Sequence, residues 1–127
     1  MKHTAERVLL YCIRDGERLG QITDLLKDLS FSYQIIDPSM SDASLGSILL
    51  RRGFPSPDVN GQPIPCEMMI LSGLSNLRLN ELLKSFRQRQ IPSVALKAVV
   101  TETNIHWTLR ELSNHLLLEH MTMTRKQ

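Results

Sequence analysis

Two unbroken hydrophobic runs, residues 8–13 and 68–71, predict buried strands because neither alternates with polar positions. A strand that is apolar on both sides is typical of the middle of a sheet covered by helices on both faces. Residues 31–36 and 94–100 are also strand-like, but they mix apolar and polar side chains. The pattern therefore predicts a four-stranded sheet with the first and third strands in the middle.

Apolar residues at helical spacing follow the first and third strands. Each set recurs every three or four positions, which predicts an amphipathic helix with one buried face. The two sets are Leu19, Ile22, Leu25, Leu26 and Leu29, and then Leu79, Leu82, Leu83 and Phe86. A C-terminal helix is expected over about 108–121, because Thr108 and Glu111 form a Ser/Thr-x-x-Glu capping box.

The chain is interpreted as a single domain, 1–127, built from two similar halves. The halves, about 7–37 and 67–100, are both strand–helix–strand units. Aligning Val8 with Met68 also aligns Leu19 with Leu79. A short helix and a proline-rich loop, together residues 38–66, join the two halves.

Two fold classes accommodate this order of elements. The favoured one is α/β, a small and mostly parallel sheet of order 2-1-3-4 with helices on both faces. In it the first and third strands run in the same direction, and residues 38–66 supply the long crossover that parallel strands require. The alternative is a ferredoxin-like βαββαβ sheet with an added C-terminal helix, in which strands alternate apolar and polar residues.

Composition and charge exclude several function classes. A net charge of +2 does not indicate a nucleic-acid-binding protein, and no apolar run approaches the roughly 20 residues that span a bilayer. The N-terminal residues lack the apolar core of a signal peptide, so we expect a bacterial cytoplasmic protein. Cys12 and Cys66 have no metal-ligand spacing, and a reducing compartment keeps both as thiols. We expect no metal, no cofactor, no nucleic-acid partner and no membrane partner.

The favoured fold also predicts where a site lies. Open parallel sheets bind ligands at the carboxyl ends of their strands, in the crevice where the strand order reverses. Here that crevice lies between the first and third strands, with Cys12 on one side, Ser72 and Gly73 on the other, and residues 101–107 at its rim. The same arrangement places Cys12 and Cys66 at opposite ends of the sheet.

The rim and the strand before it carry the most distinctive chemistry of the chain. Lys97 is either a desolvated nucleophile or a lysine that protects an edge strand. His106 suits a general base or a stacking pair. Asn104 and Trp107 also suit structural roles, bridging the corner and filling the core. The candidate binding residues are Cys12, Ser72, Gly73, Lys97, Thr103, Asn104, His106 and Trp107, and none is assigned as catalytic.

The second half resembles an uncharacterised bacterial family. Its members share a block close to Leu-Lys-Ala-Val-x-Thr-x-Thr-Asn-x-x-Trp-Thr-Leu, followed by Glu-His at the end of a helix. The matching residues are Leu96, Lys97, Ala98, Val99, Thr101, Thr103, Asn104, Trp107, Thr108, Leu109, Glu119 and His120. The resemblance runs from about residue 69 to 120. It identifies a domain of unknown function, and so it implies no activity, substrate or cofactor.

Two functional hypotheses follow. The first is a non-enzymatic module that binds a protein partner or a small regulator, because no catalytic constellation is recognisable. It includes self-association as a homodimer through the C-terminal helix, whose apolar residues exceed one stripe: Leu116, Leu117, Leu118, Met121 and Met123. The second is a small-molecule-binding or catalytic site around Lys97, Asn104, His106 and Trp107.

Overall fold

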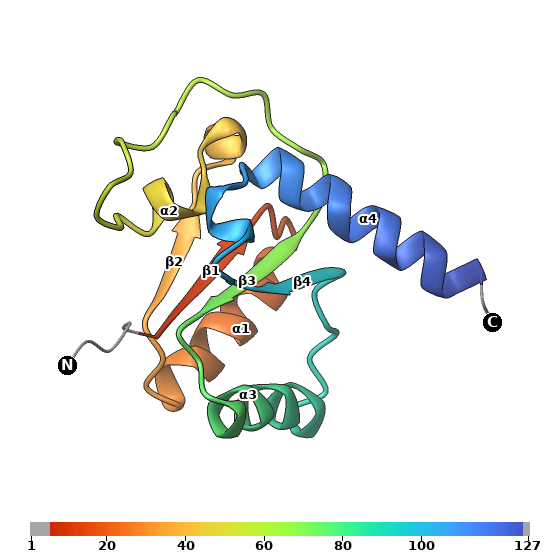
Figure 1. Ribbon diagram of the computed structural model, residues 1–127. Helices are drawn as coiled ribbons and strands as arrows, with labels where there is room; N and C mark the ends of the chain where they lie inside the picture. Colours follow the sequence, from red (N-terminus) through yellow and green to blue (C-terminus); the bar gives the residue numbers. More distant parts are fainter. Residues whose placement is uncertain (1–5, 126–127) are drawn as a thin grey trace.

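The protein forms a four-stranded sheet between two layers of helices (Figure 1). Figure 1 shows a computed structural model, which describes residues 6–125 and, within the last helix, side chains as far as Glu119. The strands are β1 (Arg7–Tyr11), β2 (Tyr33–Ile36), β3 (Met68–Ser72) and β4 (Leu96–Val99). They lie in the order β2-β1-β3-β4, so the predicted order is confirmed.

Both faces of the sheet are covered, as predicted. Helices α1 (Gly16–Asp28) and α3 (Asn76–Gln88) pack against one face. The other face carries α2 (Leu45–Ile48), α4 (Leu109–Arg125) and two 3₁₀ turns, η1 (Pro38–Asp42) and η2 (Asn104–His106). Every residue of β3 is buried, which explains why its sequence does not alternate. Helix α4 continues beyond its predicted end near residue 121.

The predicted direction of the middle strands is wrong. β1 and β3 are antiparallel, with Tyr11 opposite Met68 and Arg7 opposite Ser72, whereas the pairs β1–β2 and β3–β4 are parallel. The sheet is therefore mixed, although mostly parallel. An unbroken apolar strand indicates burial on both faces, and that burial is the same for either direction. The path of the linker decides the direction, since it crosses one end of the sheet and enters β3 from there (Figure 1).

The antiparallel pairing also relocates the cysteines. Because the end of β1 lies opposite the start of β3, Cys12 and Cys66 lie at the same end of the sheet, contrary to the prediction. Both are half-buried free thiols.

Within residues 6–125, no helix combines the length and the apolar composition that crossing a bilayer requires.

The two halves form an approximate two-fold pair. Each half runs strand, helix, strand, 3₁₀ turn, helix, so that η1 and α2 correspond to η2 and α4. Two reciprocal hydrogen bonds join the starts of α2 and α4. Leu45 N–H donates to the Trp107 carbonyl at 2.9 Å, and Leu109 N–H donates to the Ala43 carbonyl at 3.1 Å. Reciprocal contacts of this kind are typical of two-fold interfaces. The predicted similarity of the halves therefore extends to the helices after the second strand of each half.

Candidate functional site

A hollow of about 490 Å³ lies beyond the carboxyl ends of β3 and β4. Because these two strands are parallel, their carboxyl ends meet at one edge of the sheet, and the residues that follow them come together. The end of β3, the segment from β4 through η2, and a residue that follows α2 provide the walls. They are Ser72 and Gly73, then Val100, Thr101, Glu102, Ile105 and His106, and finally Arg51.

Arg51 supplies the positive charge of the hollow. Its Nη2 donates to Ser72 Oγ at 3.0 Å, and Ser72 is buried at the last position of β3. A guanidinium has five N–H donors, and this bond uses only one of them. The ion pairs among residues whose side chains are described use other arginines, namely Arg18, Arg78, Arg89 and Arg110. Arg51 can therefore donate further hydrogen bonds into the hollow.

An aromatic contact links α2 to the rim of the hollow. The centroids of the His106 and Phe54 rings are 5.3 Å apart. Phe54 reaches this position because Gly46, in α2, has no side chain: a Cβ there would lie 2.4 Å from the Phe54 ring. The hollow thus combines an imidazole, a guanidinium and the Glu102 carboxylate with an apolar wall.

Asn104 shapes the corner that follows β4. Its buried side chain accepts from Thr101 N–H at 2.8 Å and donates from Nδ2 to the Val99 carbonyl at 3.0 Å. Asn104 N–H in turn donates to Thr101 Oγ1 at 3.0 Å. These bonds use both the oxygen and the nitrogen of the side-chain amide. Asn104 therefore bridges the corner, which is the structural role considered for it from the sequence. Thr103 immediately precedes η2 and makes no side-chain capping bond there.

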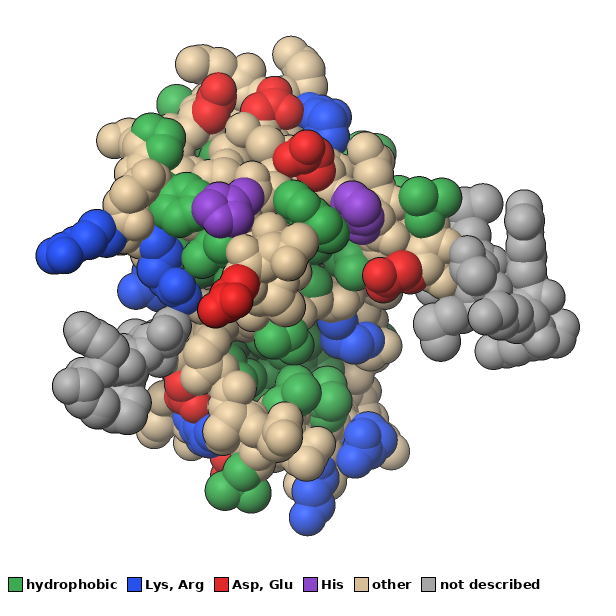
Figure 2. All heavy atoms as spheres, in the orientation of Figure 1, with side chains coloured by type: hydrophobic (Ala, Val, Ile, Leu, Met, Phe, Trp, Pro, Cys, Tyr) green, Lys and Arg blue, Asp and Glu red, His purple; other side chains and the backbone are tan. Residues whose placement is uncertain are grey.

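Trp107 packs on α4 instead of lining the hollow. Its indole is half-buried and stacks on His115, with ring centroids 4.0 Å apart and planes 11° apart. Figure 2 shows histidine side chains beside hydrophobic ones on the face that carries η2 and α4. The indole therefore joins the corner to the last helix.

The sheet separates Lys97 from the hollow. Lys97 lies opposite Met69, whose side chain belongs to the core under α1 and α3. It is exposed, lines a separate cavity of about 350 Å³ between α3 and β4, and donates from Nζ to the Val94 carbonyl at 3.3 Å. This position fits a lysine that protects an edge strand better than it fits a desolvated nucleophile.

Cys12 lies at the other end of the sheet. It lines an apolar cavity of about 380 Å³ together with Ile35 and Pro38. The predicted crevice, in which Cys12 faces Ser72 and Gly73, is therefore wrong, because antiparallel middle strands end at opposite edges. Of the candidate residues, the structure brings together Ser72, Gly73 and His106. Sequence reasoning missed Arg51, whose only signal was its place in the Arg51–Arg52 pair before the proline-rich loop.

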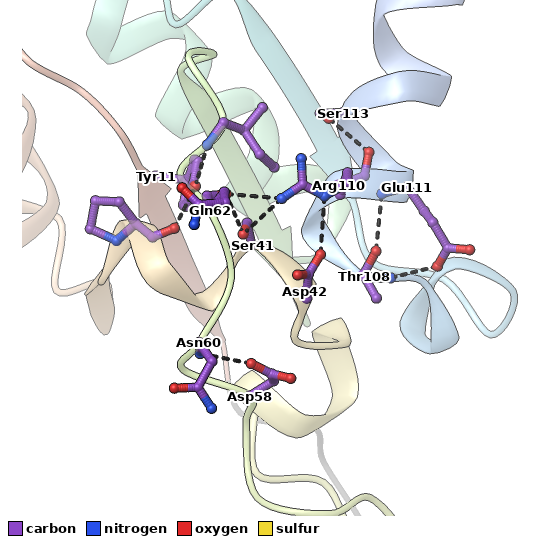
Figure 3. Close-up of polar contacts among 12 residues, drawn as sticks. Tyr11, Ser41, Asp42, Asp58, Asn60, Gln62, Thr108, Arg110, Glu111 and Ser113 are labelled. Carbon is purple, nitrogen blue, oxygen red and sulfur yellow. Dashed lines mark hydrogen bonds and ion pairs between the residues drawn. The ribbon is translucent and has the colours of Figure 1, made fainter.

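A polar cluster that the sequence did not indicate holds the linker at the Cys12 end of the sheet (Figure 3). Arg110, in α4, donates from Nε to Asp42 Oδ1 at 3.0 Å and from Nη2 to the Gln62 carbonyl at 2.9 Å. Ser41 Oγ donates to the same carbonyl at 2.6 Å. These contacts tie residues far apart in the chain, so no local pattern could reveal them.

Tyr11 completes this cluster from the end of β1 (Figure 3). Its hydroxyl donates to the Pro38 carbonyl at 2.8 Å and accepts from Ile64 N–H at 3.0 Å. Burial raises the pKa of the Tyr11 hydroxyl, which keeps it protonated and able to donate.

Among residues with described side chains, no group of three or more His, Cys, Asp or Glu is arranged to hold a metal ion.

The walls of the hollow come mostly from the second half of the chain. Residues 67–123 match a family model described as a domain of unknown function (DUF3783). The predicted resemblance to an uncharacterised domain family is confirmed for this segment. The matched segment includes β3, α3, β4 and η2 and ends within α4, whereas Arg51 lies outside it. No curated protein and no solved structure matches the chain.

Proposed function

We propose that the protein is a non-enzymatic binding module whose ligand occupies the hollow beyond β3 and β4. The contact between Arg51 and Ser72, at 3.0 Å, carries this proposal, because it holds a guanidinium at a buried strand end beside an open cavity. Guanidinium N–H groups bind carboxylate and carbonyl oxygens with defined geometry. The ligand we propose therefore presents such an oxygen to Arg51.

The positions of the other candidate residues support binding over catalysis. A nucleophile and its base need to lie within hydrogen-bond reach of each other. Lys97 lies on the other face of the sheet, and both ends of the Asn104 amide bond the backbone. His106 contacts the ring of Phe54, and Trp107 stacks on α4.

The test is a fragment screen by nuclear magnetic resonance, with small carboxylates and amides as probes and the full chain isotope-labelled. We expect binders to shift the amide signals of Ser72, Gly73 and residues 101–106. Arg51→Ala should abolish these shifts, whereas Arg52→Ala, which changes an exposed neighbour outside the hollow, should keep them. Binders that map to another surface, or that retain full affinity for Arg51→Ala, would contradict the proposal. Conversion of a bound fragment during long incubation would contradict its non-enzymatic part.

Self-association through α4 is a second candidate, favoured by the exposure of its leucines. Leu118 is 64% exposed and Leu117 is 37% exposed, on a helix whose outer part extends away from the sheet (Figure 1). We expect sedimentation velocity to show a concentration-dependent dimer that Leu118→Glu removes, because a buried carboxylate is unfavourable in an apolar contact. Glu119→Gln is the matched control on the same helix. A monomer at all concentrations would exclude this candidate.

We also propose a cytoplasmic location. Cys12 and Cys66 are free and half-buried, which suits a reducing compartment. Fractionation of cells with an antibody against the protein tests the location, and recovery outside the cytoplasm would contradict it.

A further inference from the structure

The two halves differ at the place where their strands end. β1 ends at Tyr11 and β3 ends at Ser72, and both residues are buried; the two strand ends correspond one position out of step with the alignment of Val8 with Met68. Beyond β1 and β2, the linker covers the tyrosine hydroxyl. Beyond β3 and β4, the smaller Ser72 leaves the hollow beside Arg51. On the side of the sheet that carries α2 and α4, one of two corresponding places is therefore filled by the linker and the other is open, whereas the cavity lined by Cys12 lies toward α1.

The filled place shows how a peptide segment binds there. The linker runs through it without helix or strand, and Ile64 is only 6% exposed. Ile64 N–H donates to the Tyr11 hydroxyl at 3.0 Å, and the Gln62 carbonyl accepts from Arg110 Nη2 at 2.9 Å. An arginine holds the carbonyl of the segment and a hydroxyl accepts its N–H (Figure 3). The branched side chain of Ile64 packs in the hydrophobic core on the same face of the sheet.

The open hollow offers the same three kinds of group. Arg51 follows α2 and reaches over the end of β3 in the other half, as Arg110 in α4 reaches over the first half. The two arginines do not occupy corresponding sequence positions, but each crosses between the halves. Ser72 provides the hydroxyl at the strand end, and Val100 and Ile105 provide an apolar wall. Glu102 adds a further acceptor for peptide N–H groups.

We propose that the open hollow binds a coil peptide segment of another protein, in the way that residues 62–64 fill the corresponding place. This inference rests on the proposed function and names its ligand class. The segment presents a backbone carbonyl or a carboxylate to Arg51. Two residues later it places a branched apolar side chain against Val100 and Ile105.

The probe is a synthetic peptide of the linker itself, residues 60–67 with Cys66→Ser, titrated into the isotope-labelled full chain. We expect shifts of the amide signals of Ser72, Gly73 and residues 101–106. A control peptide with Ile64→Asp should bind about tenfold more weakly, because an ionised carboxylate is unfavourable in an apolar pocket. Arg51→Ala should weaken binding of the first peptide about fivefold through loss of a charged hydrogen bond. Arg52→Ala should leave it unchanged.

Three results would overturn the inference. The first is the absence of shifts at about 2 mM peptide, which excludes even millimolar affinity. The others are equal affinity for the two peptides and shifts centred on Tyr11 and Ser41. The last pattern would mean that the probe only exchanges with the linker in its own place. If small carboxylates or amides shift the residues of the hollow and the peptide does not, the ligand is a small molecule. The proposed function then stands and the peptide inference fails. If no probe binds the hollow, both are contradicted.

Discussion

Gly46 contributes to the candidate site by having no side chain. A Cβ at this position would lie 2.4 Å from the ring of Phe54, which contacts His106 at the rim of the hollow. We expect Gly46→Ala to displace that ring and to lower the free energy of unfolding by about 1–3 kcal/mol, as overpacking does. Urea denaturation measures the change.

Gly20→Ala is the matched control for that substitution. Gly20 lies inside α1, and a Cβ there would meet nothing within 4 Å. Because alanine has the higher helix propensity, this variant should gain up to about 1 kcal/mol. Equal effects of the two substitutions would mean that Phe54 does not pack on Gly46.

Glu67 links folding to pH through its contact with Arg18. Arg18 Nη1 donates to Glu67 Oε2 at 2.8 Å, and this hydrogen bond lowers the pKa of the Glu67 carboxyl from its ordinary value of 4.5. Since the folded pKa lies below the unfolded one, the contribution is fully present above pH 4.5 and is lost as pH falls through the folded pKa.

We therefore expect Glu67→Gln to be less stable than the unmodified protein at pH 7, by about 1–2 kcal/mol for a charged hydrogen bond that solvent partly screens. The difference should shrink as the solution is acidified below the ordinary carboxyl pKa. Denaturant titrations at several pH values measure this. A difference that is constant with pH would show that the ion pair does not contribute in this way.

At the scale of helices and strands, local sequence signals were sufficient to predict where the strands and α-helices of the described residues lie. The capping box is present, because Thr108 N–H donates to Glu111 Oε1 at 2.9 Å and Glu111 N–H donates to Thr108 Oγ1 at 3.1 Å. The strand order also followed from burial on two faces. The direction of β3 did not follow from burial. It depends on where the linker crosses the sheet, and contacts between Arg110, Ser41 and Gln62 hold the linker in that place.

The same limit explains which part of the site could be predicted. Ser72, Gly73 and His106 come together because β3 and β4 are parallel, and the parallel direction of these two strands was predicted correctly. Cys12 was grouped with them through the wrong direction of the middle strands. Lys97 was grouped with Trp107 by closeness in sequence, although it projects toward the α3 face.

Arg110 is the residue that we expect to control the linker. Arg110→Ala removes its bonds to Asp42, Ser41 and the Gln62 carbonyl. Hydrogen exchange of the Gly61 and Ile64 amides should then accelerate by about tenfold or more, because local opening becomes easier. Arg89→Ala is the control, since its ion pair with Asp28 is exposed. Unchanged exchange in Arg110→Ala would show that other contacts hold the linker.

For the molecule as a whole, the approximate two-fold relation organises the binding surfaces. The segment that matches the domain of unknown function, residues 67–123, has the same succession of elements as the first half. An arginine from the other half lies near the strand ends of each half: Arg110 near those of β1 and β2, and Arg51 near those of β3 and β4. The linker fills one of these places, and the open one is the site for which we propose a ligand.

The antiparallel pairing of β1 with β3 determines which residues share each end of the sheet. In such a pair, the Cα atoms of alternate opposed residues approach to about 4.5 Å, so their Hα atoms lie close together. Nuclear Overhauser spectroscopy of the labelled protein should show strong Hα–Hα contacts at alternate pairs of the register that joins Val8 to Leu71 and Leu10 to Met69. Contacts in the staggered pattern of parallel strands, with no such Hα–Hα pairs, would contradict this architecture and the separation of Cys12 from the hollow.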